Sequence, residues 1–171
     1  MDNKPLDYHI PQGWVIFIFV YYFALILGGA IFVLYFLLYG MQGELSQESV
    51  REYTFYVSML SSAMLTGVRY SQKLYKACID GRVSFESNNK SVIIGNVLYF
   101  LLRPIYSVVF TIMFVICLIG GMKFLVGGMD CTINERMVYL SAIVSGIIGF
   151  SIGNVLDLFD VFSKEQINKI I

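Results

Sequence analysis

The side chains that could carry out chemistry are few and scattered in this chain of 171 residues. There is one histidine, His9, and there are three cysteines, Cys78, Cys117 and Cys131. A zinc site or a catalytic triad needs several such groups at one place, and these lie far apart along the sequence. We therefore expect no catalytic residue, no metal site and no bound cofactor.

The carboxylates with helical spacing are Asp157 and Asp160, which would share one face of a helix. A cation site needs further oxygen ligands, so we interpret this pair as the solvated end of an apolar segment. The long apolar segments contain no His, Asp or Glu, which excludes intramembrane proteases, and there is no phosphate-binding glycine loop of an ATP-driven transporter. Twelve basic and twelve acidic residues balance, so direct nucleic-acid binding is not expected.

The composition is typical of a membrane protein, with 57 % hydrophobic residues, 14 % charged residues and a mean hydropathy of +0.72. Four segments are predicted to cross the bilayer, at about 14–39, 53–70, 104–126 and 137–157. The second is rich in hydroxyl groups, so we expect it to face other helices or water rather than lipid. The predicted fold is an all-α polytopic membrane protein whose single four-helix transmembrane domain takes up residues 1–171.

Proline, glycine and capping residues predict where the helices begin and end. Arg103-Pro104 interrupts a long apolar stretch, and because proline disfavours helix in the residue before it, residues 91–102 are predicted to form a separate interfacial helix before the third span. Ser49 followed by Glu52 predicts a capping box at the start of the second helix, and Gly81 is expected to close that helix. Residues 71–90 then form a cytoplasmic segment and residues 158–171 a cytoplasmic tail.

Orientation follows from the positive charges. With four crossings, both termini and the segment from 69 to 103 share one side of the membrane. That side carries nine basic residues, namely Lys4, Arg69, Lys73, Lys76, Arg82, Lys90, Arg103, Lys164 and Lys169. The other side carries three, Arg51, Lys123 and Arg136. Because positive charge is retained on the inner side, both termini are predicted to be cytoplasmic.

Small residues recur at helical spacing on two spans and predict close helix packing. They are Ser141, Ser145, Gly149 and Gly153 on the fourth span, and Ala24 and Gly28 on the first. Such a ridge lets another helix approach closely, either within one protomer or at a seam between protomers. We expect a homo-oligomer in addition to internal packing, with a tetramer as the candidate stoichiometry.

Two further groups of residues have candidate roles. Ser58, Ser62 and Thr66 would line water if the second span formed a pore. On the cytoplasmic side, a protein partner or anionic lipid would contact residues that are basic or aromatic, namely Arg69, Lys73, Lys76, Arg82, Phe85 and Phe162.

The C-terminal 70 residues resemble a two-span module, with Leu102-Arg103-Pro104 at its entry, Gly120-Gly121 after it and Gly149-Phe150-Ser151 in its last span. On these residues the chain resembles the KwaA-like membrane subunits of Kiwa anti-phage defence systems. That resemblance implies a homo-oligomer in the bacterial inner membrane that holds a cytoplasmic effector protein. The membrane subunit would act as a sensor or scaffold of antiviral defence. The resemblance implies no catalytic residue. Two alternatives stay open, a pore-forming or membrane-depolarising effector and an assembly factor of a larger membrane complex.

Overall fold

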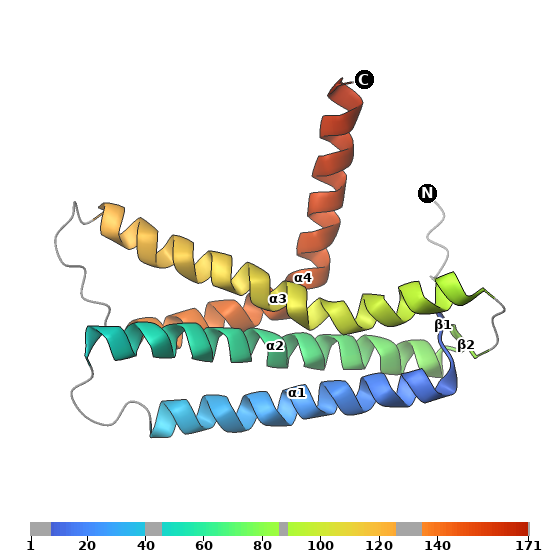
Figure 1. Cartoon of the computed structure of the whole chain (residues 1–171), viewed down its shortest axis with the longest axis horizontal. Coiled ribbons are helices and arrows are strands. Elements are labelled where there is room, and N and C mark those ends of the chain that lie inside the picture. The colour runs from blue at the N-terminus through green and yellow to red at the C-terminus, as the bar shows by residue number, and fades with distance from the viewer. Residues whose placement is uncertain (1–7, 40–45, 86–88, 126–134, 171) are drawn as a thin grey trace.

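Four long helices form an elongated bundle, with one short strand pair at one end (Figure 1). This computed structural model describes residues 8–39, 46–85, 89–125 and 135–170, and within them the backbone alone of 122–125, 135 and 157–170. The helices are α1 (Gln12–Leu38), α2 (Gln47–Ile79), α3 (Lys90–Leu125) and α4 (Glu135–Ile170). The C-terminal part of α4, dark orange to red in Figure 1, turns steeply away from the other helices.

Three of the helices are long and apolar enough to cross a membrane, over Gln12–Leu38, Lys90–Gly121 and Arg136–Leu156. Large apolar side chains on their outer faces are exposed, such as Ile31 on α1, Met113 on α3 and Ile143 on α4. A surface of this kind suits contact with lipid rather than water. The prediction is thus confirmed to the extent that three helices have the length and apolar character needed to cross a membrane.

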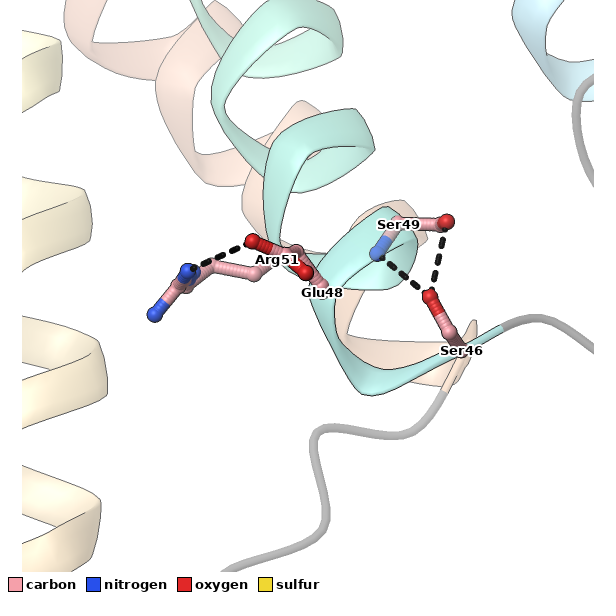
Figure 2. Close-up of polar contacts among 4 residues, drawn as sticks. All are labelled: Ser46, Glu48, Ser49 and Arg51. Atoms are coloured by element: carbon pink, nitrogen blue, oxygen red, sulfur yellow. Dashed lines mark hydrogen bonds and ion pairs between the residues drawn. The ribbon is translucent and has the colours of Figure 1, made fainter.

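Helix α2 lies at the centre of the bundle, where it contacts all three other helices. Its start differs from the predicted capping box. Ser46 is the N-cap, and its Oγ accepts a hydrogen bond of 3.2 Å from the backbone N–H of Ser49 (Figure 2). The prediction that Ser49 is the cap was wrong, because the earlier serine provides the same acceptor and the helix continues back to it. The predicted end is confirmed, since α2 stops at Ile79 and Gly81 has a φ of +67°.

Helix α3 is continuous through Pro104, so the prediction of a separate interfacial helix over 91–102 was wrong. Proline lacks the N–H that would bond the carbonyl oxygen of Phe100, four residues earlier. The hydroxyl group of Tyr22, on α1, donates a hydrogen bond of 2.5 Å to that oxygen instead, inside the protein. A tertiary contact therefore satisfies the group that proline leaves unpaired, and the helix does not need to break.

A cluster of hydroxyl groups joins α2, α3 and α4 in the middle of the bundle. We call Ser62, Thr66 and Ser107 the hydroxyl cluster, and all three are fully buried. Thr66 Oγ1 lies 2.7 Å from Ser107 Oγ and 2.9 Å from the backbone oxygen of Gly149, while Ser62 and Ser107 share a hydrogen bond. These bonds replace hydrophobic attraction, which contributes little to pairing between helices surrounded by lipid.

The strand pair ties the two ends of the first helical hairpin together. Strand β1 (Tyr8–His9) runs parallel to β2 (Val83–Ser84), with Tyr8 opposite Val83 and His9 opposite Ser84. The sequence showed no sign of these strands, because two residues are too few to produce an alternating pattern. They hold the segment before α1 against the segment after α2.

Candidate functional site

A cavity of about 430 Å³ opens at the strand end of the bundle, between α2, α4 and β1. We call it the basic pocket. Four cationic side chains line it, Arg69, Lys73, Lys76 and Arg82. They come from successive turns at the end of α2 and from the residue that precedes β2, so the pocket depends on the length of α2 and on the short connection to β2.

Aromatic rings form the wall of the basic pocket behind these charges. Tyr8, Tyr70, Tyr99 and Phe150 come from four different elements and all line the cavity. Tyr99 packs against Tyr8 with ring centroids 6.2 Å apart and against Tyr70 with centroids 6.1 Å apart. The wall is therefore assembled by the tertiary fold.

Arg103 packs against two rings of this wall. Its guanidinium carbon lies 4.3 Å from the centre of the Tyr99 ring and 5.4 Å from that of Tyr70, which are cation–π contacts. The residue is only 9 % exposed, and its Nη1 has no hydrogen-bond partner within the described part of the chain. A buried positive charge thus lies directly against two pocket-lining rings.

Lys73 is held in the pocket by a neighbouring hydroxyl group. Lys73 Nζ donates a hydrogen bond of 2.7 Å to the hydroxyl of Tyr99. Burial acts to lower the pKa of Lys73, but this hydrogen bond and the neighbouring Tyr8 outweigh it, so the pKa lies above its ordinary value. Arg82 forms an ion pair of 2.5 Å with Asp80, the carboxylate that lines the pocket.

These groups suit the pocket to binding negative charge. Its polar lining offers N–H and O–H donors, including the amides of Gln72 and Asn154, and among the described residues no histidine or cysteine lines it. Over the described residues, no group of three or more His, Cys, Asp or Glu side chains could hold a metal ion. The arrangement favours recognition of an anion.

The small residues of the fourth span pack against α2 within one chain. Ser141 and Ser145 are fully buried, and a Cβ atom added to Gly149 would lie 2.2 Å from the backbone oxygen of Ser62. A Cβ at Gly153 would lie 2.8 Å from the hydroxyl oxygen of Tyr70. Of the two kinds of packing expected, the structure contains the internal one on this ridge.

On α1 the close approach uses a different residue from the predicted ones. Ala24 is exposed, and a Cβ added to Gly28 would meet nothing within 4 Å. Gly29 is buried instead, and a Cβ there would lie 3.0 Å from the Cβ of Met64. The ridge of Ala24 and Gly28 therefore does not pack on α2, and its role at a seam between protomers stays a prediction.

The candidate pore residues are buried inside the protomer. Ser58, Ser62 and Thr66 are each fully covered by the surrounding helices. Ser62 and Thr66 belong to the hydroxyl cluster, and Ser58 Oγ has no hydrogen-bond partner among the described residues. In this protomer they do not line an open channel.

The other predicted site residues are spread over the chain. Phe85 is 55 % exposed beside β2, and Cys78 and Cys117 are free cysteines. The predictions on Cys131 and on the side chains of three residues of the α4 tail, Asp157, Asp160 and Phe162, lie outside the described residues.

His9 is half-buried in β1. Its backbone oxygen accepts a hydrogen bond of 3.4 Å from Asn96.

The aromatic wall was not predicted from the sequence. Tyr99 and Arg103 are four residues apart, so they share a helix face, and this spacing was a usable signal for their contact. Tyr8 had no such signal, because it reaches the pocket only through the pairing of β1 with β2.

No protein-family model, curated protein or solved structure matches this chain.

Proposed function

We propose that this chain is a non-enzymatic membrane subunit that crosses the bilayer four times, self-associates, and docks or regulates a cytoplasmic partner. Both termini would be cytoplasmic, as the distribution of basic residues predicts. In line with the resemblance of its C-terminal half, we place it in the bacterial inner membrane as a sensor or scaffold of antiviral defence.

The position of α2 supports the fourth crossing. This helix is less apolar than the others, and its polar side chains would be costly in contact with lipid. Surrounded by α1, α3 and α4, it keeps those side chains against protein, where Thr54, Ser61 and Thr66 form hydrogen bonds. Polar groups at membrane depth are tolerated when protein covers them in this way.

The observation that carries the proposal is the contrast between the two kinds of surface. Along α1 the exposed side chains from Trp14 to Leu38 are apolar or aromatic, whereas the strand end gathers Arg69, Lys73, Lys76 and Arg82 in the basic pocket and carries the exposed ring of Phe85 next to β2. Basic and aromatic groups are common in surfaces that bind proteins or anionic headgroups. An apolar body with one such end suits a membrane-held docking subunit.

The pore alternative receives less support. A pore lined by Ser58, Ser62 and Thr66 would require α2 to separate from α3 and α4, which would break the hydroxyl cluster. The scaffold needs no such rearrangement.

The test is the native mass of the protein, extracted with detergent from its own host through an affinity tag. We expect a homo-oligomer that retains a soluble protein. The variant Phe85→Ser should reduce that retention. Tyr39→Ser is the matched control, because Tyr39 is an equally large ring, 63 % exposed, at the opposite end of the bundle. A homo-oligomer without any partner would favour the pore, and a monomer would contradict the proposal.

A further inference from the structure

We propose that the basic pocket binds a phosphate group, and that this phosphate belongs to the headgroup of a membrane lipid. The inference rests on the proposed function only in placing the pocket beside the cytoplasmic surface of a membrane. The pocket itself is a feature of the protomer.

The first argument is the excess of positive charge. Arg82 is paired with Asp80, but Arg69, Lys73 and Lys76 form no ion pair within the described part of the chain. All three line the same cavity, so their charges repel one another. A ligand with two or more negative charges relieves this repulsion, and a phosphate monoester carries between 1.5 and 2 charges, roughly, at neutral pH.

The second argument is the buried charge of Arg103. The residue is nine-tenths buried, and its guanidinium group has cation–π contacts with Tyr70 and Tyr99 while Nη1 has no partner among the described residues. Taking a charge out of water without an opposite charge is unfavourable. Because Arg103 contacts two of the rings that line the pocket, an anion bound there would lie near this charge and compensate part of it.

The third argument is size. A cavity of about 430 Å³ lies within the range of small-molecule sites, which is about 300–1,000 Å³, and is too small for a folded domain. Its lining supplies the donors that a phosphorylated headgroup needs, because Lys73 and Arg69 can bond phosphate oxygens and Asn154 can bond a neighbouring hydroxyl. The pocket therefore fits a small phosphorylated ligand.

A second cavity indicates that the phosphate is on a lipid. This cavity, of about 310 Å³, lies along α1 and α2 and is lined mainly by apolar side chains, among them Phe19, Phe23, Ile26 and Tyr75. Gln72 lines both cavities, so the two adjoin. A phospholipid with its headgroup in the basic pocket can lay an acyl chain in the apolar cavity, whereas a soluble phosphorylated molecule would leave that cavity unused.

The experiment measures lipid retention by native mass spectrometry. The whole protein is purified in detergent, and phosphatidic acid or phosphatidylcholine is added at matched concentration. We expect each chain to retain phosphatidic acid in preference to phosphatidylcholine. The double substitution Lys73→Gln with Lys76→Gln should lower the affinity for phosphatidic acid about tenfold or more, because it removes two charge-assisted hydrogen bonds. Lys90→Gln is the matched control, since it removes an exposed cation outside the pocket, and we expect it to leave retention unchanged.

Two further measurements separate the possible outcomes. In the first, inorganic pyrophosphate is added to the protein with bound phosphatidic acid. Displacement of the lipid from the wild type, without any effect on the double variant, would support the phosphate site. It would also allow a soluble ligand as the source of the phosphate. Retention of phosphatidic acid that is equal in the wild type and in the double variant would overturn the proposal, provided that the thermal midpoint shows both to be folded. The oligomer mass and the retained soluble protein are read from the same spectra, so a failure of the lipid site is distinguishable from a failure of the proposed function.

Discussion

Gly149 is the position where one added methyl group should do the most damage. A Cβ there would lie 2.2 Å from the backbone oxygen of Ser62 and 2.9 Å from its carbonyl carbon and Cα. The obstacle is backbone, so no side-chain rotation relieves it. To reach ordinary contact, α2 and α4 must separate by about 1 Å, which a close-packed interface does not absorb without loss.

The expected effect of Gly149→Ala is a loss of about 3 kcal/mol in the free energy of unfolding. Overpacking of this kind costs about 1–3 kcal/mol. The separation also weakens two bonds between the helices, from Thr66 to the oxygen of Gly149 at 2.9 Å and from Ser61 to the oxygen of Ala142 at 2.8 Å. Each contributes roughly 0.6 kcal/mol in a membrane protein.

Stability is measured by titrating detergent-solubilised protein with sodium dodecyl sulfate and following unfolding by pulse proteolysis. Gly28→Ala is the control, because a Cβ at Gly28 meets nothing within 4 Å and alanine favours helix. We expect the control to unfold at the wild-type concentration or above it. Equal stability of the two variants would refute the close approach of α2 to α4. Since Gly149 packs inside the protomer, a larger residue there reports on folding and cannot locate an oligomer seam.

Three further predictions concern single side chains. Tyr22→Phe should lower the free energy of unfolding by about 1–3 kcal/mol in the same assay, because the buried carbonyl of Phe100 loses its donor. Adding Pro104→Ala should recover most of this loss, because it restores a backbone N–H to α3. If stability is not recovered, the compensation described for α3 is contradicted. Burial raises the pKa of the Cys78 thiol, so at pH 8 maleimide should label this thiol more slowly than it labels glutathione. The labelling rate should increase as the pH rises and the thiolate forms. A rate equal to that of glutathione would show that the thiol is solvated. Ser46→Ala should increase amide hydrogen exchange in the first turn of α2 and destabilise it by about 1 kcal/mol, and unchanged exchange would argue against this cap.

The parts of the fold that could be predicted depend on neighbours in the sequence. The apolar run that begins near Trp14 predicted α1, and Gly81 predicted the end of α2, because composition and local backbone conformation decide both. The continuity of α3 could not be predicted, since the donor that compensates Pro104 is Tyr22, 82 residues earlier in the chain. A rule for proline that considers one helix alone cannot include it.

The candidate site divides in the same way. The basic residues Arg69, Lys73 and Lys76 follow helical spacing, so their common face was readable. The cavity beside them needs Tyr8 from β1 and Phe150 from α4, which only the tertiary fold brings to α2. The spacing of the small residues on α4 predicted that another helix packs closely against them. It did not identify α2 as that helix.

The central place of α2 has a consequence for biosynthesis. A segment with so little apolar character partitions poorly into the bilayer when it leaves the translocon alone. In the proposed four-span arrangement it must therefore enter together with α1, as a helical hairpin. Glycosylation mapping should show α2 inserted efficiently when α1 precedes it and poorly when an unrelated hydrophobic segment replaces α1. Insertion, as well as folding, would then depend on the contact between these two helices.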